Sequence, residues 1–201
     1  MAQEIRENPA RPEGAAGAQM LDRMNQSHAP LRRWGLPHIE WTPGMRILDA
    51  GCGGGATIAE MFAYAKDAMI DGVDYSDVSV EASRKLNKER LGHRCEIKKA
   101  DVTHLPYVDD TFDLVTAVET VYFWPDIAAA LREIRRVLKP YGVIAILNEG
   151  SDPDTLDWPE IDGFMKIYRP EELTALLREA GFNAIRFYRG AGQEIFVTAR
   201  K

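Results

Sequence analysis

Cysteine and histidine are scarce in this chain, and their scarcity argues against several kinds of protein. Among the 201 residues there are two cysteines and four histidines, and no cysteine–histidine cluster has metal-ligand spacing. Nothing suggests a disulfide framework, so we expect a reducing, cytoplasmic environment. No apolar run approaches the roughly 18 residues that span a bilayer. We therefore expect a protein with no resident metal and no membrane segment.

A strong excess of charge of one sign is also lacking. The net charge of −6 argues weakly against a polyanionic partner. The basic stretch at residues 88–99 is more typical of a solvated helix end than of a nucleic-acid patch. Hydrophobic residues at 45% and charged residues at 28% are those of an ordinary globular protein. The length favours one domain, which we expect to be a monomer or homodimer without nucleic acid.

The most informative segment that is present reads Ile-Leu-Asp-Ala-Gly-Cys-Gly-Gly-Gly, at residues 47–55. Its first residues end a buried strand, with Asp49 at the carboxyl edge. Glycines at every second position follow, in a loop whose backbone can turn sharply and approach a ligand closely. A helical stretch at 56–65 comes next. This order predicts a nucleotide-type cofactor site, although a tight turn that needs glycine would explain the loop alone.

A second acidic residue strengthens that interpretation. Residues 69–73 read as another strand, and Asp74 stands at its end, about twenty residues beyond the glycine loop. A carboxylate at this place can accept two hydrogen bonds from a ribose diol. The alternative for Asp74 is a turn residue or a helix cap. Ser76 is the better cap candidate, which leaves Asp74 for a ligand.

Strands and helices alternate along the chain after residue 45. The predicted strands are 46–50, 69–74, 94–99, 112–118 and 143–148, and the predicted helices are 56–65, 76–91, 126–138 and 170–180. Such alternation favours an α/β fold, with a parallel sheet covered by helices on both faces. The chain then ends in two β-rich runs, 184–189 and 194–200. Their connection is too short for a parallel crossover, so we expect a hairpin and one antiparallel strand.

These motifs together resemble those of a known family, the class I methyltransferases that use S-adenosylmethionine. The resemblance covers residues 43–201. It rests on the acid and alternating glycines of 49–55, the acid at 74, Ala-Asp-Val at 100–102 and Phe-Asp-Leu-Val at 112–115. The turn before the fifth strand is also similar, with Tyr141 where glycine is usual. The resemblance implies a Rossmann-like, doubly wound sheet of seven strands, mostly parallel.

The resemblance also implies which residues hold the cofactor. The ribose would bind Asp74, while the Asp101 carboxylate and the Val102 backbone would meet the adenine. The cofactor-binding residues are then expected to be Asp49, Gly51, Cys52, Gly53, Asp74, Tyr75, Asp101, Val102 and Glu119. Physical chemistry agrees, because a carboxylate at Asp49 would repel a pyrophosphate and favour a sulfonium or ammonium. S-adenosylmethionine is therefore favoured over the nicotinamide cofactor of a dehydrogenase.

Two segments are candidates for the side of the site that binds the methyl acceptor. In the family, the loop 119–125 faces the methyl group, and its aromatic rings could attract a sulfonium. We expect Tyr122 to be catalytic because its hydroxyl needs a partner, although these rings could equally belong to the core. Residues 20–42 are expected to form a lid, helical at 32–41. His28 on this lid is a candidate base, with a structural histidine as the alternative.

The sequence thus predicts three segments of the chain and one function. Residues 1–19, polar and rich in Ala, Pro and Gly, should be a disordered tail rather than a signal peptide. The lid 20–42 and a methyltransferase domain at 43–201 follow. The cover at 149–169 is short, which favours methyl transfer to a small molecule, with S-adenosylhomocysteine as the product. A protein or RNA substrate, or a non-catalytic S-adenosylmethionine-binding protein, remain the alternatives.

Overall fold

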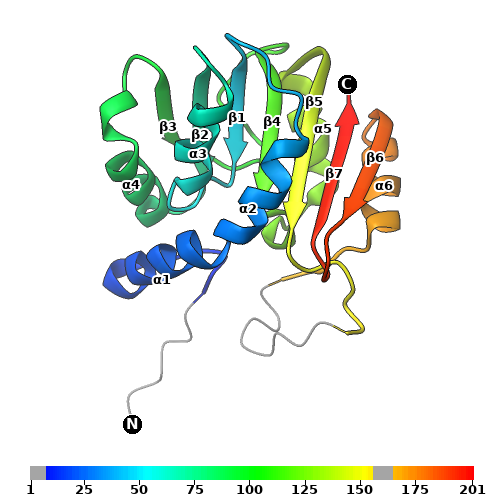
Figure 1. Ribbon diagram of the computed structural model, residues 1–201, viewed down its shortest axis with the longest axis horizontal. Coiled ribbons are helices and arrows are strands. Elements are labelled where there is room, and N and C mark those ends of the chain that lie inside the picture. The colour runs from blue at the N-terminus through cyan, green and yellow to red at the C-terminus, as the bar shows by residue number, and fades with distance from the viewer. Residues whose placement is uncertain (1–7, 156–164) are drawn as a thin grey trace.

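The computed structural model describes residues 8–155 and 165–201 and has one central sheet with helices on both faces (Figure 1). The strands are β1 (Arg46–Ala50), β2 (Met69–Asp74), β3 (Cys95–Lys99), β4 (Phe112–Val118), β5 (Leu138–Asn148), β6 (Asn183–Arg189) and β7 (Ile195–Arg200). The helices are α1 (Gly14–Ser27), α2 (Ala29–Gly35), α3 (Ala56–Tyr64), α4 (Asp77–Leu86), α5 (Ile127–Val137) and α6 (Pro170–Glu179). Short 3₁₀ turns are η1 (Leu36–His38), η2 (Lys88–Arg90) and η3 (Val121–Phe123).

The sheet has the predicted topology. Its seven strands lie in the order β3-β2-β1-β4-β5-β7-β6. The pairs from β3 to β5 are parallel, and β7 runs antiparallel to both of its neighbours. The sequence prediction of a mostly parallel sheet with one antiparallel strand is therefore confirmed.

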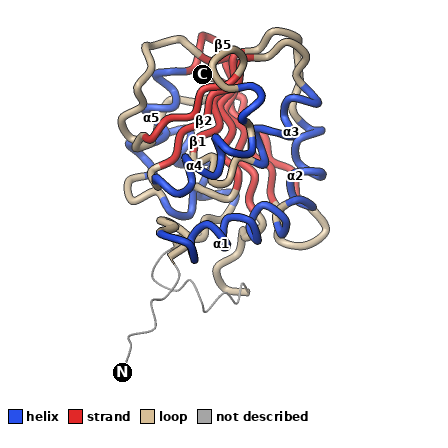
Figure 2. Tube along the Cα trace, turned by 90° about the vertical axis from the view of Figure 1, so that its left-hand side faces the viewer, coloured by secondary structure: helices blue, strands red, loops and turns tan. Residues whose placement is uncertain are grey.

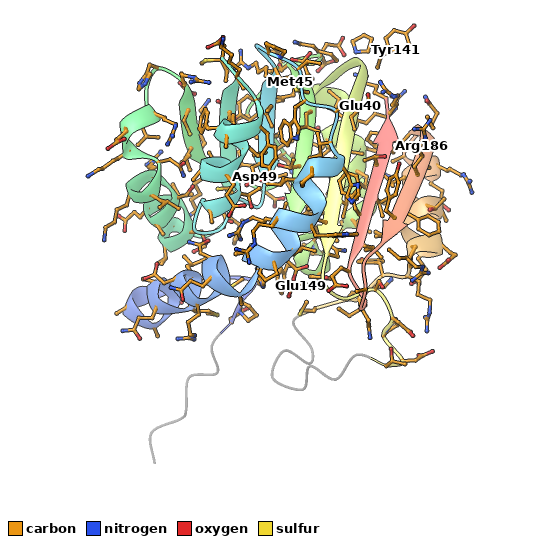
Figure 3. All side chains as sticks on the ribbon, viewed as in Figure 1. Glu40, Met45, Asp49, Tyr141, Glu149 and Arg186 are labelled. Carbon is orange, nitrogen blue, oxygen red and sulfur yellow. The ribbon has the colours of Figure 1, made fainter. Side chains whose placement is uncertain are left out.

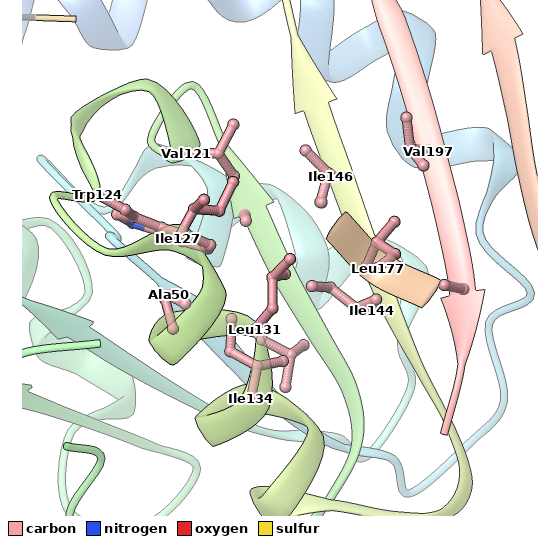
Figure 4. Packing of buried hydrophobic residues seen from close by; sticks show 14 of the residues in the cluster. Ala50, Val121, Trp124, Ile127, Leu131, Ile134, Ile144, Ile146, Leu177 and Val197 are labelled. Atoms are coloured by element: carbon pink, nitrogen blue, oxygen red, sulfur yellow. The ribbon is translucent and has the colours of Figure 1, made fainter. Parts of the chain in front are cut away.

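Two apolar layers fix the helices on the two faces of the sheet. On one face, Ile127, Leu131 and Ile134 of α5 pack with Leu177 of α6 against β5 and β7 (Figure 4). On the other face, buried side chains of α2, α3 and α4 pack on the same sheet. Each fully buried Leu or Ile contributes about 2 kcal/mol through the hydrophobic effect. The sheet is thereby held rigid, and the loops at its carboxyl edge have a fixed base.

The helix α1 lies at that carboxyl edge. It crosses beneath the ends of the parallel strands, away from both covered faces (Figures 1 and 2). Met20 and Leu21 on this helix are buried. In the described part of the chain, no helix is both long and apolar enough to cross a bilayer.

The start of the chain differs from the prediction of a disordered tail over residues 1–19. Residues 1–7 lie outside the described residues, but α1 begins at Gly14, well before the predicted lid. Alanine-rich sequence favours a helix once it has a surface to pack on. Two contacts supply that surface: Gly17 packs against Pro12, and the Ser76 hydroxyl donates to the Pro12 carbonyl at 2.7 Å.

The predicted helix at 32–41 is also wrong in its bounds. The helix α2 begins at Ala29, next to Pro30, which suits the first turn because its missing N–H would be unpaired there. It ends at Gly35, and Pro37 then holds the chain in the turn η1. Helix 76–91 is likewise divided, into α4 and η2.

Tyr141 provides a test of local strain. The strand β5 begins at Leu138, earlier than predicted, and Tyr141 within it has a φ of 66°. Glycine here is expected to raise the free energy of unfolding by about 0.5–1 kcal/mol, because this backbone region disfavours side chains. The side chain is 80% exposed and lies at the end of the sheet opposite Glu149, so no core contact is lost (Figure 3). Urea unfolding of Tyr141→Gly would measure this gain, and a lower stability would contradict the strain.

Candidate functional site

A cavity of about 400 Å³ opens at the carboxyl edge of the sheet. Its walls come from the segment before α1, from α1 itself, from the glycine loop, and from the ends of β2 and β4. Its size is that of a site for a nucleoside-sized ligand. Because α1 closes one side, a ligand in the cavity would be shielded from water.

The glycine loop after β1 forms the floor of this cavity. The N–H groups of Gly51 and Cys52 both donate to the carbonyl of Val73 at the end of β2, at 2.8 and 2.9 Å. Gly51 has a φ of +80°, and a Cβ there would lie 2.0 Å from the Thr120 hydroxyl oxygen. The loop is thus clamped between β2 and the end of β4, and it leaves no room for a side chain at position 51. This packing explains why position 51 requires glycine, while the close approach of its backbone to a ligand stays a prediction.

Asp74 connects the loop to the cavity wall. It lines the cavity, and its Oδ2 accepts from the Gly53 N–H at 2.9 Å while its Oδ1 accepts from the Ser76 N–H at 2.9 Å. Burial raises the pKa of this carboxyl, and the backbone donors oppose that rise. Ser76 caps α4 by accepting from the Ser79 N–H, as predicted. Hydrogen bonds from the Ser79 side chain and the Tyr75 backbone also lower the pKa of Asp74, so its carboxylate is held firmly at the cavity wall.

The neighbouring residues Tyr75, Asp101 and Val102 line the same part of the cavity. The Tyr75 ring is exposed and lies under the Arg11 guanidinium, 5.3 Å from the ring centre. The Oδ1 of Asp101 accepts from both the N–H and the hydroxyl of Thr103, at 2.8 Å each. These bonds hold the pKa of Asp101 below its usual value. The carboxylate is therefore charged and oriented before any ligand arrives.

Asp49 was expected among the ligand-contacting residues, but it does not line the cavity. It is fully buried beneath the glycine loop, where its Oδ1 accepts from the Thr116 hydroxyl at 2.7 Å. Among the described residues its Oδ2 has no hydrogen-bond partner. Burial raises the pKa of Asp49 to about 7. Asp49 can therefore act on a bound cation through its charge, but not by contact.

His28 and Glu119 do meet at the cavity, at the junction of α1 with α2. The His28 Nε2 lies 3.8 Å from the Glu119 Oε2 and 4.0 Å from the Glu149 Oε2. Burial lowers the pKa of His28 to about 4, so the imidazole is neutral near neutral pH. Burial also raises the pKa of Glu119 to about 8. A neutral imidazole can accept a proton, but this low pKa makes it a weak base.

Tyr122, predicted to face the acceptor, is buried and absent from the cavity wall. Its hydroxyl donates to the Glu119 Oε1 at 3.0 Å and accepts from the Gly150 N–H at 2.8 Å. Phe123 and Trp124 line the cavity instead. The turn η3 rotates the three aromatics in different directions, which their order in the sequence does not reveal. Tyr122 is thus a positioning residue for Glu119.

Comparison with known proteins adds to this geometry. Residues 48–146 match the model of a family described as a methyltransferase domain. The sterol 24-C-methyltransferase erg6 of Aspergillus fumigatus is 30% identical over 71% of this chain and 41% of its own length. The 27-O-demethylrifamycin SV methyltransferase of Amycolatopsis mediterranei is 35% identical over 69% of this chain and 54% of its own.

The chain belongs to the class I S-adenosylmethionine-dependent methyltransferases. The chain spans about half the length of the curated relatives above. Its fold is shared by a crystal structure of an S-adenosylmethionine-dependent methyltransferase from Aquifex aeolicus. That structure matches with a TM-score of 0.76 at 21% identity, over 91% of this chain and 97% of the other.

Three residues at or beside the cavity were not predicted from the sequence. Arg11 and Arg32 line the cavity, and Glu149 lies beside His28. Arg32 is buried, donates to the Glu60 carboxylate at 2.9 Å and to the Asn25 carbonyl at 2.7 Å, and so ties α2 to α1 and α3. An arginine in a polar segment carries no sequence signal for such burial. Glu149 follows β5 directly, whereas Arg11 and Arg32 reach the site because the segments before and after α1 lie at the same edge of the sheet.

Proposed function

We propose that this chain binds S-adenosylmethionine in the cavity and catalyses methyl transfer from it to a small-molecule acceptor. The single observation that carries this proposal is the gathering of acidic side chains at the cavity. The half-buried Asp74 and the buried Glu119 lie on its wall, and Asp49 is buried just behind the glycine loop. A cationic sulfonium favours the ionised forms of these carboxyls, whereas a pyrophosphate would be repelled by them.

The cofactor's parts can be assigned to residues by their chemistry. Asp74 and Tyr75 would hold the ribose, with Asp101 and the Val102 backbone at the adenine. The methionine end would lie over Gly51, Cys52 and Gly53, toward Glu119. The unpartnered Oδ2 of Asp49 supports this fit, because a buried carboxylate without a donor is stabilised by a nearby positive charge.

S-adenosylmethionine supplies an activated methyl group whose leaving group departs as a neutral thioether. The protein's task is then to position the partners and to exclude water, which can contribute on the order of 7–11 kcal/mol. The helix α1 covers the cavity, which suits it as a lid. Phe123 and Trp124 present apolar and aromatic surface to the reacting end. His28 could take a proton from the acceptor, but its lowered pKa makes this contribution small.

The acceptor, the cellular location and the partners of the protein belong to the same proposal. The relatives named above bear the names of enzymes for sterols and a rifamycin, which supports a small-molecule acceptor. Cys52 and Cys95 are free and buried, in keeping with a cytoplasmic location. We further propose that the protein acts without nucleic acid, as a monomer or homodimer. A protein or RNA substrate would predict turnover only with the macromolecule, and a non-catalytic binder would predict none.

Calorimetric titration with S-adenosylmethionine, S-adenosylhomocysteine and NAD tests the proposal directly. We expect micromolar affinity for the two adenosyl compounds and no binding of NAD. A panel of small hydroxyl, amine, thiol and olefin acceptors would follow, with S-adenosylhomocysteine release as the readout. Binding of NAD alone would overturn the proposal, and binding without any turnover would favour a non-catalytic protein.

The pKa of Asp49 predicts how cofactor affinity depends on pH. Because a sulfonium favours the ionised carboxylate, binding should tighten as pH rises through about 7, and the Glu119 carboxyl, whose pKa is about 8, should extend this rise. Asp49→Asn should bind more weakly and lose the part of the rise near pH 7. The raised pKa also means that protonated Asp49 favours folding and that this contribution is lost as pH rises through about 7. Titrations between pH 6 and 8 check the first statement, and an unchanged slope in Asp49→Asn would contradict it.

A further inference from the structure

We propose that His28, Glu119 and Glu149 form a binding site for one divalent cation beside the cofactor cavity. Their ligand atoms, one imidazole nitrogen and two carboxylate oxygens, all lie within 4.8 Å of one another. Three segments distant in the sequence supply them: the α1–α2 junction, the residue after β4 and the residue after β5. The absence of a metal motif from the sequence therefore does not exclude this site.

The donor set suits a divalent transition-metal ion. Imidazole nitrogen is a ligand for Zn²⁺ and Fe²⁺, carboxylate oxygen is a ligand for Mn²⁺ and Zn²⁺, and a set of three protein ligands leaves coordination positions open. Metal–ligand distances of roughly 2.0–2.2 Å require the three groups to close by a few tenths of an ångström. The His28 and Glu149 side chains are 19% and 29% exposed, so they have room to move, whereas Glu119 is buried.

The surroundings of Glu119 resemble the outer shell of a metal ligand. Its Oε1 is occupied, because it accepts from the Tyr122 hydroxyl and from the Glu149 N–H. Its Oε2 points to His28, and among the described residues it accepts no hydrogen bond. The 3.8 Å separation from the His28 Nε2 is too long for one. Ligating carboxylates are commonly held in this way, with one oxygen fixed and the other directed at the ion.

The electrostatics of the cluster favour a cation. Two carboxyl groups face the imidazole in a partly desolvated corner, and no Lys or Arg of the described residues forms an ion pair with either of them. Burial disfavours the ionised form of each carboxyl, and a divalent ion would stabilise both in that form. The same ion would use the lone pair of the imidazole. An ammonium ion would be attracted too, but it would leave the imidazole as a mere hydrogen-bond acceptor.

The position of the ion would determine which chemical class of methyl acceptor can bind. This step rests on the proposed function. Open coordination positions would face the cavity, where a hydroxylated acceptor with a second adjacent oxygen could chelate the ion. The bound hydroxyl would lose its proton to water more easily. Its oxygen would attack the methyl carbon as the carbon–sulfur bond breaks, and the electron pair would stay on the neutral sulfur.

Titration of the untagged, chelator-treated protein with Mn²⁺ tests the site without any turnover. Free Mn²⁺ is measured by its electron paramagnetic resonance signal, and we expect one ion bound per chain. His28→Ala and Glu119→Gln should each weaken binding at least tenfold. Tyr122→Phe should weaken it 10- to 100-fold, because it frees the Glu119 carboxylate while keeping the ring. Glu96→Gln is the matched control and should bind normally. It changes an exposed carboxylate on β3 that pairs with Lys98, away from the site.

The outcomes distinguish a failure of the metal site from a failure of the proposed function. Wild-type protein that binds no Mn²⁺ at millimolar concentration, or variants that all bind like wild type, would overturn the metal site. If the same protein still binds S-adenosylmethionine in calorimetry, the proposed function survives that failure. Turnover of amines by the metal-free protein would instead assign the three side chains to an ammonium. Circular dichroism of each variant separates lost binding from lost folding.

Discussion

Alanine at position 74 is expected to weaken S-adenosylmethionine binding by about 100-fold or more. Asp74 is the acid at the cavity wall that would accept from the ribose diol, and hydrogen bonds to a charged group contribute about 1.5–3 kcal/mol each. The same carboxylate anchors the loop at Gly53 and the start of α4 at Ser76. Removing it therefore takes away a ligand contact and loosens the floor of the site. Calorimetry at constant pH would measure the change.

Two further variants separate these contributions. Asp74→Asn keeps one carbonyl oxygen and the side-chain shape, so we expect an intermediate loss of about tenfold. Asp77→Ala, three residues later, removes an exposed carboxylate that pairs with Lys99 at 2.6 Å, and it should bind like wild type. A folded Asp74→Ala protein with nearly wild-type affinity would show that the ribose does not bind here. Equal losses in Asp74→Ala and Asp77→Ala would point to a general effect of charge.

The parts of the fold that could be predicted are those whose signals are local. The strands β1, β2 and β4 have the predicted bounds, because each is a short apolar run that ends at an acid, a glycine or a polar residue. The terminal hairpin followed from the length of its connection alone. The bounds of β5 were missed because Tyr141 stands in a turn position that usually holds glycine, and its unfavourable φ is held by the strands on either side.

The predicted part of the candidate site consists of residues that directly follow strands of the sheet. The loop residues and Asp74 follow directly from strands that end at one edge, so their proximity could be inferred. The burial of Tyr122 depends on Gly150, which lies after another strand. The cluster of His28, Glu119 and Glu149 depends on where α1 crosses the sheet. Residues 14–19 are alanine-rich, but their helix could not be predicted, because part of the surface that orders them comes from Ser76, far along the chain.

Gly51→Ala, which adds one methyl group to the glycine loop, is expected to lower both stability and cofactor affinity strongly. The new Cβ would lie 2.0 Å from the Thr120 Oγ1 and 2.8 Å from the Thr120 Cβ. Overpacking of this kind costs about 1–3 kcal/mol, and the φ of +80° adds about 1 kcal/mol. If the loop instead shifts to relieve the overlap, the backbone donors of Gly51 and Cys52 leave Val73 and the cofactor floor is lost. Stability should fall by about 2–4 kcal/mol, with cofactor affinity at least 100-fold weaker.

Gly92→Ala is the matched control, because it separates steric overlap from backbone strain. Gly92 has a φ of +79°, almost that of Gly51, but a Cβ there would meet nothing within 4 Å. It should therefore lose about 1 kcal/mol of stability and bind S-adenosylmethionine normally. Adding Thr120→Ala to Gly51→Ala should restore part of the stability, since the hydroxyl that the Cβ strikes is gone. Equal urea midpoints for the Gly51 and Gly92 variants would show that backbone strain alone, and not contact with Thr120, requires glycine in the loop.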